Sequence, residues 1–311
     1  MRLVFCGTPQ FAVPALEKLV REGHEIPLVL TQPDRPKGRG MELALSPVKV
    51  CAQRHGLAIQ QPEKIKNNAE LMETLGKIAP DAIIVVGYGR IVPKWMLDLP
   101  RFGNINLHGS LLPKYRGAAP IQWAIASGES VTGVTTMLLN EGLDTGDILL
   151  QQSEPIADDD TSLTLAARLA AIGAELMQQT LAGLGAGTIR PIRQDDSQAT
   201  LAPILKREDG EVNFALTARE ISNRLRGFQP WPGAYTTFRG KKLILHVVKI
   251  MDRSPEALSS ARAVNHHGNL IVGCGQGSAL EILELQLEGK KRVSARDFLA
   301  GYRLDPDETL G

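Results

Sequence analysis

The first half of the chain alternates short, continuously apolar runs with segments of helical spacing. The apolar runs occupy residues 2–6, 26–31, 81–87, 105–109 and 133–139. Runs without polar alternation are typical of strands in a parallel sheet that helices cover on both faces. The pattern therefore predicts an α/β domain with a Rossmann-like, mostly parallel sheet.

The helices between these runs carry recognisable boundary signals. Ser46 directly precedes Pro47, which is the arrangement of an N-cap followed by the first helical residue. A much longer helical pattern covers residues 161–184. The segment that follows it loses all periodicity, and we expect a linker there.

The pattern changes after the linker. Short strand-like runs separated by turn residues occupy residues 210–214, 233–238, 241–250, 268–275 and 279–287. Such a series predicts a small β-barrel or sandwich. We therefore expect a first domain over residues 1–189, a linker over 190–206 and a second domain over 207–311.

Charge and cysteine content restrict the class of protein. The net charge is +1, so any contact with nucleic acid requires a local basic patch. The three cysteines are odd in number and far apart, and no clustered Cys/His pattern suggests a metal. No signal peptide and no apolar run of the ~18 residues that a membrane span needs is present. We expect a cytoplasmic protein without a metal or a membrane contact.

Candidate chemistry gathers where one strand ends. Alternation along a strand puts Asn106 and His108 on one face and Leu107 on the other. In a doubly wound sheet, ligands bind beyond the carboxyl ends of the strands. Asp144 lies in a glycine-rich loop after a later strand. An Asn that donates to an oxyanion, a His that donates or moves a proton, and a supporting carboxylate predict acyl transfer without a covalent intermediate.

Other interpretations compete with this one. Judged on residue type alone, His108 could be a structural hydrogen-bonding residue and Asp144 a turn former. A nicotinamide enzyme is disfavoured, because no G-x-G-x-x-G motif follows the first strand and no acidic residue closes the second.

Longer stretches carry a family resemblance. The segments "NINLHGSLLPKYRGAAPIQWAI", "GLDTGDIL" and "VFCGTPQFAVPAL" closely resemble signatures of the folate-dependent formyltransferases. The resemblance implies that Asn106, His108 and Asp144 are catalytic. It also implies a formylfolate site formed by the loop of Ser110, Leu111, Leu112 and Pro113, with Tyr88 and Ile91 as a further wall.

Three further segments resemble the branch of this family that acts on tRNA. They are "TQPDRPKGRGMELALSPVK", "RLRGFQPWPGAY" and "LQLEGKKRVSARDFLAGY", and they imply an OB-like, tRNA-binding second domain. Ile204 departs from the family, which usually has a Lys there, and we expect no effect on the chemistry. The tRNA contacts implied are Arg35, Lys37, Arg39, Lys49, Lys290, Lys291 and Arg292.

The expected reaction transfers the formyl group of 10-formyltetrahydrofolate to the α-amine of initiator methionyl-tRNA, which supplies formylmethionyl-tRNA for translation initiation. We expect a monomer. The two glycines and the proline of residues 34–40 predict a loop that lacks regular structure until tRNA binds. One alternative is a formyltransferase acting on a small amine, such as a nucleotide sugar or glycinamide ribonucleotide. Another is an RNA-binding module without chemistry.

Overall fold

The computed structural model describes residues 1–37, 42–255 and 257–311, with the main chain alone at 36, 37, 42 and 43. The predicted tRNA contact Arg39 lies outside the described residues. The chain forms two compact units. The first comprises Met1–Pro120, Val131–Pro155 and Leu165–Pro203, and the second comprises Ile121–Ser130, Ile156–Thr164 and Ile204–Gly311.

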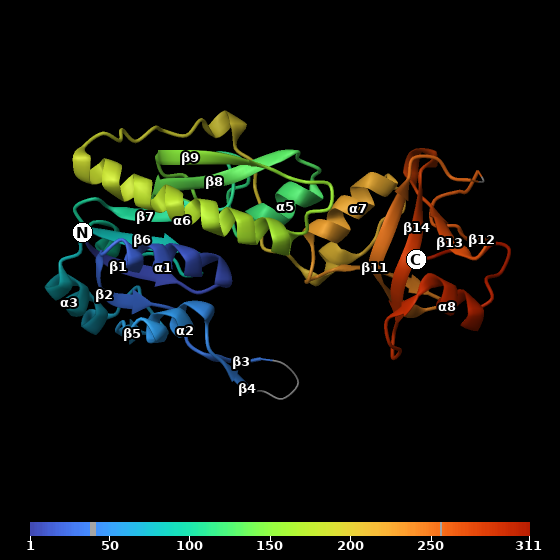
Figure 1. Ribbon diagram of the computed structural model, residues 1–311, viewed down its shortest axis with the longest axis horizontal. Coiled ribbons are helices and arrows are strands. Elements are labelled where there is room, and N and C mark those ends of the chain that lie inside the picture. Colours follow the sequence, from blue (N-terminus) through green and yellow to red (C-terminus); the bar gives the residue numbers. More distant parts are fainter. Residues whose placement is uncertain (38–41, 256) are drawn as a thin grey trace. The chain divides into compact units, whose positions relative to one another are not determined.

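The first unit is built on a seven-stranded sheet in the order β5-β2-β1-β6-β7-β8-β9 (Figure 1). β7 and β8 pair antiparallel, as do β8 and β9, whereas the other neighbours are parallel. The strand order reverses beside β1, which creates the switch point where such sheets bind ligands. The strands are β1 (Arg2–Gly7), β2 (Glu25–Leu30), β5 (Ile59–Gln60), β6 (Ala82–Val86), β7 (Asn104–His108), β8 (Val131–Leu138) and β9 (Ile148–Pro155).

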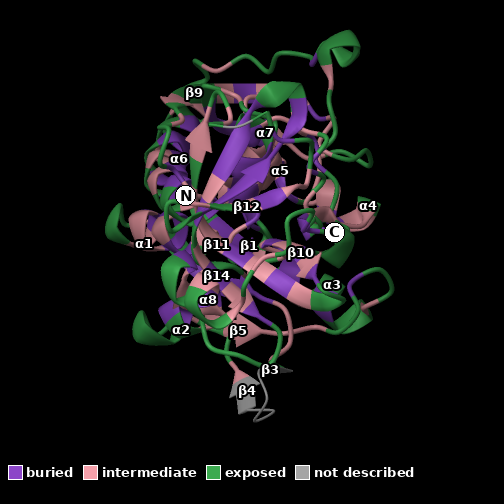
Figure 2. Ribbon diagram, turned by 90° about the vertical axis from the view of Figure 1, so that its right-hand side faces the viewer, coloured by how far each residue is buried: buried purple, intermediate pink, exposed green. Residues whose placement is uncertain are grey.

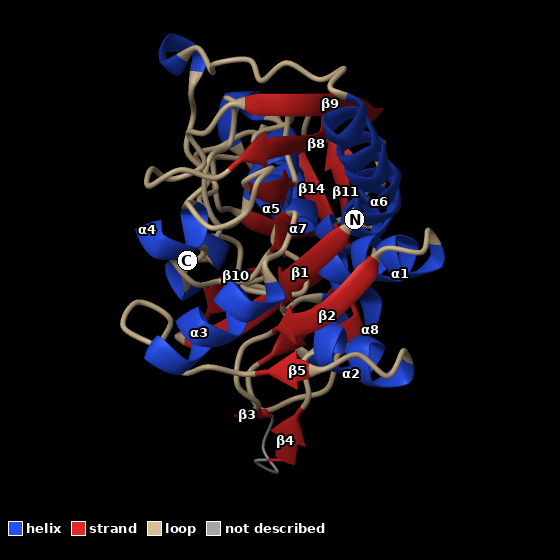
Figure 3. Ribbon diagram, turned by 90° about the vertical axis from the view of Figure 1, so that its left-hand side faces the viewer, coloured by secondary structure: helices blue, strands red, loops and turns tan. Residues whose placement is uncertain are grey.

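Helices cover both faces of this sheet (Figure 3). On one face, Val4 and Cys6 of β1 and Ile83 and Val85 of β6 lie in one buried cluster. Leu71, Leu75 and Met96 belong to the same cluster. On the other face, Gly173 and Thr180 of the long helix approach Leu107 and Thr136. The helices are α1 (Val13–Arg21), α2 (Pro47–Arg54), α3 (Ala69–Ile78), α4 (Lys94–Leu97) and α6 (Ser162–Ala186), with the 3-10 turns η1 (Gln10–Ala12) and η2 (Asp196–Gln198).

Buried residues line the strands and the inner surfaces of the helices, and exposed residues lie mainly on loops and outer helical surfaces (Figure 2). The predicted cap of α2 is confirmed, because the Ser46 side chain accepts a hydrogen bond from the Lys49 main-chain N–H. Among the described residues, no helix is both long and apolar enough to cross a membrane, and this holds for the 25-residue α6.

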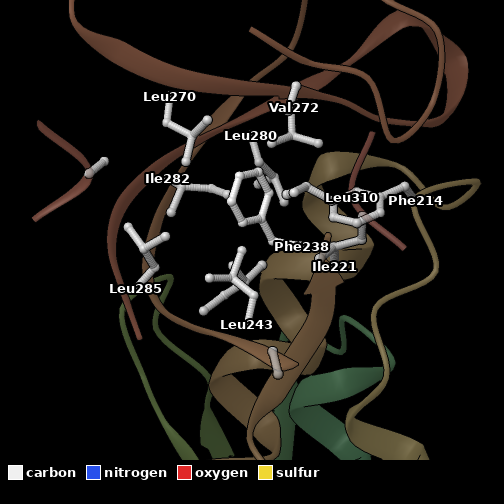
Figure 4. Close-up of a cluster of buried hydrophobic side chains, with 14 of the residues drawn as sticks. Phe214, Ile221, Phe238, Leu243, Leu270, Val272, Leu280, Ile282, Leu285 and Leu310 are labelled. Carbon is white, nitrogen blue, oxygen red and sulfur yellow. The ribbon is translucent and has the colours of Figure 1, made fainter. Parts of the chain in front are cut away.

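The second unit contains an antiparallel sheet in the order β10-β11-β14-β13-β12, with β15 paired to β14. Its apolar side converges on Phe238, Leu243, Leu280 and Ile282, which Figure 4 shows within one cluster. The elements are β10 (Ala234–Phe238), β11 (Lys241–Met251), β12 (Ala263–His266), β13 (Asn269–Gly273), β14 (Ala279–Leu287), β15 (Val293–Ser294), η3 (Arg207–Gly210), η4 (Gly275–Gly277), α5 (Pro120–Ala126), α7 (Ala218–Gly227) and α8 (Ala295–Gly301).

The C-terminal tail links the two outer strands of this sheet. The Ala263 main-chain N–H of β12 donates to the Glu308 carbonyl, and the Gly311 N–H donates to the Thr237 carbonyl of β10. The tail therefore completes a barrel-like ring of main-chain hydrogen bonds. The predicted fold class, a Rossmann-like α/β domain followed by a smaller OB-like β domain, is confirmed.

Two local predictions are wrong. The prediction that residues 34–40 lack regular structure is wrong for residues 35–37, because β3 (Arg35–Lys37) pairs antiparallel with β4 (Glu42–Ala44). Residues 210–214 contain no strand; Glu211 makes only an isolated bridge to Tyr235. Short runs of this kind satisfy either interpretation in sequence, and their tertiary partners decide between them.

Candidate active site

β7 presents three polar side chains, Asn104, Asn106 and His108, on one face of the sheet. Asn104 pairs with Ile83 and Asn106 with Val85, so both share the face of the buried cluster that contains Ile83 and Val85. Asn104 donates to the main-chain carbonyls of Met96 (2.8 Å) and Leu97 (3.1 Å). Within the described part of the chain, the Asn106 carboxamide has no hydrogen-bond partner although the residue is 8% exposed. Asn104 is therefore structural, and Asn106 is free to meet a ligand.

His108 is oriented at both ring nitrogens. Its Nε2 lies 2.9 Å from the Tyr115 carbonyl oxygen, and its Nδ1 lies 3.7 Å from Asp144 Oδ2. A carbonyl accepts but cannot donate, so Nε2 carries a proton in this arrangement. The His108 side chain is 6% exposed, so the Tyr115 carbonyl and the Asp144 carboxylate fix the position of a buried ring.

The Asp144 loop is tightly constrained. Asp144 has a φ of 51°, an uncommon conformation for a residue with a side chain, and its Oδ2 accepts from the Gly117 N–H at 2.8 Å. Gly117 has a φ of 124° and lies so close to Ala202 that a Cβ would meet its carbonyl oxygen at 2.6 Å. Gly146 leaves even less room, since a Cβ there would lie 1.7 Å from the Leu138 carbonyl oxygen. These glycines are required by the backbone approach that aims Asp144 at His108.

The loop at Ser110, Leu111, Leu112 and Pro113 is held from beneath by β8 and β9. Thr135 donates to the Ser110 carbonyl at 2.7 Å and accepts from the Leu112 N–H at 3.2 Å. Gln151 of β9 donates to the Leu112 carbonyl at 2.9 Å. The Ser110 hydroxyl is itself buried and donates to the Lys114 carbonyl at 2.6 Å. Sequence reasoning missed Thr135 and Gln151, because their loop partners are 23 to 39 residues away in sequence.

The two predicted wall residues differ in their placement. The Tyr88 side chain is 2% exposed and packs in the core, whereas its main-chain carbonyl accepts from Gln32 Nε2 at 3.0 Å. Ile91 is 92% exposed. Tyr88 can therefore contribute to a ligand site through its main chain, and Ile91 through its side chain.

The predicted tRNA contacts fall into two groups. Lys49 forms an ion pair with Asp34 and lies 2.7 Å from Gln61 Oε1, and Arg292 forms an ion pair with Glu284. Arg35, Lys290 and Lys291 are exposed. For Lys37 only the main chain is described, and Arg39 lies outside the described residues.

One group of potential metal ligands occurs among the described residues. Glu17, Cys51 and His55 bring ligand atoms within 4.8 Å of one another. Glu17 already pairs with Arg54 at 3.2 Å, and burial raises the pKa of the Cys51 thiol to about 11. A protonated thiol and an engaged carboxylate are poor ligands for a metal.

The fold and this site define a formyl transferase. The sequence profile described as "Formyl transferase" matches residues 1–181, and the profile of the family's C-terminal domain matches residues 204–303. Relatives named methionyl-tRNA formyltransferase in Koribacter versatilis and Acidobacterium capsulatum are each 61% identical over 311 residues. The match covers 100% of this chain and 99% and 100% of those relatives, respectively. The chain belongs to the methionyl-tRNA formyltransferase family, which confirms the predicted enzyme class.

Solved structures agree on the fold. An N-formyltransferase from Helicobacter canadensis, in complex with folinic acid and dTDP-3-aminofucose, matches with a TM-score of 0.65 and 18% identity. The match covers 90% of this chain and 98% of that one. Glycinamide ribonucleotide transformylase 1 from Symbiobacterium toebii matches with a TM-score of 0.51 and 23% identity, over 63% of this chain and 94% of its own. At these identities the likeness concerns the fold alone.

Proposed function

We propose that the protein transfers the formyl group of 10-formyltetrahydrofolate to the α-amine of initiator methionyl-tRNA. The observation that carries the proposal is the unpartnered Asn106 carboxamide beside an oriented His108–Asp144 pair at the end of β7. An amide donor that the protein leaves without a partner is suited to an oxygen that gains charge during reaction.

The proposed chemistry forms a bond between the amine nitrogen and the formyl carbon and breaks the bond between that carbon and the folate nitrogen. Asn106 donates to the developing oxyanion. His108 donates through Nε2, exchanging the Tyr115 carbonyl for the formyl oxygen. Asp144 stabilises the protonated imidazole and orders a water that carries the amine proton to the folate nitrogen. No nucleophilic side chain takes part.

The co-substrate is proposed to lie against loop 110–113, with the Tyr88 main chain and the Ile91 side chain as its far wall. The three hydrogen bonds that Thr135 and Gln151 make to this loop support the assignment, because they fix its main chain before any ligand arrives. A preformed loop lowers the entropic cost of binding.

For tRNA, we propose contacts by Arg35, Lys37, Arg39, Lys290 and Lys291. Lys49 and Arg292 are weaker candidates, since each already neutralises a carboxylate. The proposed domains remain 1–189, 190–206 and 207–311, and the ends of the two family profiles, at 181 and 204, support them. We also propose a cytoplasmic monomer.

An assay with three acceptors tests the proposal. The protein is incubated with 10-formyltetrahydrofolate and charged initiator tRNA, charged elongator tRNA or a free nucleotide-sugar amine. Formyl transfer to the initiator alone is expected, and transfer to the sugar amine alone would contradict it. Asn106→Ala is expected to lower kcat ~10²–10³-fold with little change in folate affinity. A variant that retains more than about a tenth of the rate would remove Asn106 from the oxyanion role.

A further inference from the structure

One side chain of the predicted linker is buried beneath the active-site loops. Gln194 lies after α6 and is 5% exposed. Its Nε2 donates to the main-chain carbonyls of Asp144 (2.8 Å) and Gly146 (2.7 Å). Its Oε1 accepts from the Arg116 guanidinium at 3.0 Å and 2.8 Å. Both polar atoms of one carboxamide thus join the two loops that carry Asp144 and Gly117.

Arg116 fixes the other end of this bridge. It is 7% exposed, and its Nη2 also donates to Asp196 Oδ1 at 2.7 Å. Its main-chain N–H donates to the Thr200 carbonyl at 2.8 Å, and its carbonyl accepts from the Ala202 N–H at 2.7 Å. Residues 194–202 therefore hold the loop around Arg116 and Gly117 through both side-chain and main-chain hydrogen bonds.

Asp144 needs such support. Its left-handed backbone costs energy and persists only where neighbouring groups hold it. The Gly117 N–H holds the carboxylate, and Gln194 holds the main chain of the same residue. We propose that Gln194 is a positioning residue that aims the Asp144 carboxylate at His108 Nδ1. The inference rests on the proposed role of Asp144 in catalysis.

A purely structural role for Gln194 predicts different behaviour. If Gln194 only satisfied buried groups, its loss would lower the melting temperature and leave the turnover of the folded enzyme unchanged. If it positions Asp144, its loss lowers kcat and spares the KM values for formylfolate and charged tRNA. Misplacement of a reacting group by about 1 Å costs up to ~10²-fold in rate.

Three variants separate these cases. Gln194→Ala is expected to lower kcat ~10–10²-fold. Gln194→Glu keeps an acceptor for Arg116 but turns an oxygen toward the two carbonyls, so it should also lower kcat. Gln198→Ala is the matched control. This exposed glutamine of the same segment bonds only Asp195 among the described residues, so the variant should retain full kcat. If Gln194→Ala is too unstable, Gln194→Asn replaces it and should lose kcat with KM retained. Wild-type kcat in the folded Gln194 variants would overturn the inference.

A double-mutant cycle distinguishes failure of the inference from failure of the proposed function. In an Asp144→Ala background, adding Gln194→Ala should change kcat less than twofold, because the group that Gln194 positions is already gone. If the double variant loses kcat by the product of the two single-variant losses, Gln194 does not act through Asp144 and the inference is overturned. If Asp144→Ala itself leaves kcat intact, the proposed function of Asp144 fails first.

Discussion

Two asparagines on one strand face illustrate how neighbours assign a role to a side chain. Asn104 and Asn106 are two residues apart in β7 and point the same way, yet Asn104 caps the end of α4 through Met96 and Leu97. Asn106 has no such partner in the described part of the chain. The same residue type is thus structural at one position and available for chemistry at the next.

Asn104→Ala should therefore behave in the opposite way to Asn106→Ala. We expect it to lower the free energy of unfolding by about 1–3 kcal/mol, because the buried Met96 carbonyl and the partly buried Leu97 carbonyl lose their donor. The kcat of the folded protein should stay within a few-fold of wild type. Thermal melting and turnover measured on the same preparation check this, and a large loss of kcat without destabilisation would refute it.

The three thiols should react slowly. Cys6, Cys51 and Cys274 are buried and free, and burial raises the pKa of Cys51 to about 11 and that of Cys274 to about 12. Because the thiolate is the reactive form, little of it is present at neutral pH. A disulfide exchange reagent should label none of them rapidly at pH 7 and all of them after denaturation. Rapid labelling of Cys51 in the native protein would contradict this.

At the scale of elements, the β3–β4 ribbon is anchored at its base by Asp34, Lys49 and Gln61. Lys49 donates to Asp34, and Gln61 donates to Asp34 Oδ1 at 2.9 Å and to the Gln32 carbonyl at 2.8 Å. These hydrogen bonds, first from Lys49 and then from Gln61, hold the pKa of the Asp34 carboxyl below its ordinary value. Lys49 therefore stabilises the base of the ribbon through its contacts with Asp34 and Gln61.

Lys49→Met should lower the melting temperature and leave the salt dependence of tRNA binding unchanged. Arg35→Met, at an exposed position of the same ribbon, should keep the melting temperature and lower the salt slope by ~1 if its guanidinium contacts a phosphate. Affinity for charged tRNA titrated over a range of salt concentrations measures both. The reverse pattern would make Lys49 the tRNA contact.

Sequence patterns located the elements whose periodicity is strong. The run predicted at 279–287 is β14, and Asn106 and His108 do share one face of β7. β9 was not predicted, because its exposed residues Gln151–Ser153 interrupt the apolar run that marks a buried strand. Residues 194–202 looked like a linker because the partners that hold them are far away in sequence. Gly146 is 48 residues from Gln194, and Arg116 is 78 residues from it. Contacts at that distance leave no periodic signal.

At the scale of the whole molecule, each compact unit is built from segments that are separated in sequence, and the second unit includes Ile121–Ser130. In the second unit, Trp123 of α5 packs edge-on against Phe228 at 5.2 Å, and Gly227 lies against the Gln122 main chain. A fragment of residues 1–206 would keep α5 but lose these partners. We expect it to bind a hydrophobic dye and to melt below the full chain. Melting at the full-chain temperature, without dye binding, would show that α5 does not depend on residues 207–311.

The ion pairs between Arg239 and the C-terminal tail should make the stability of the second unit sensitive to acid. Arg239 pairs with Glu308 and Asp305, and the hydrogen bond from Arg239 holds the pKa of Glu308 below the ordinary 4.5. A depressed carboxyl pKa stabilises the fold above 4.5, and this contribution is lost as the pH falls through the folded value. The melting temperature of wild type should therefore fall more steeply below about pH 5 than that of Glu308→Gln. Parallel curves of melting temperature against pH for the two proteins would contradict a stabilising role for this ion pair.

The pairing of Arg116 with Thr200 and Ala202 also sets the moment in synthesis at which the enzyme becomes competent. A nascent chain that has emerged from the ribosome only as far as residue 189 already carries Asn106, His108 and Asp144, but it lacks Gln194 and the strand-like segment that holds the loop. We therefore expect the site to assemble only once residue 203 is free of the exit tunnel. A product of premature termination before that point would carry the three proposed catalytic residues without the segment that aligns them.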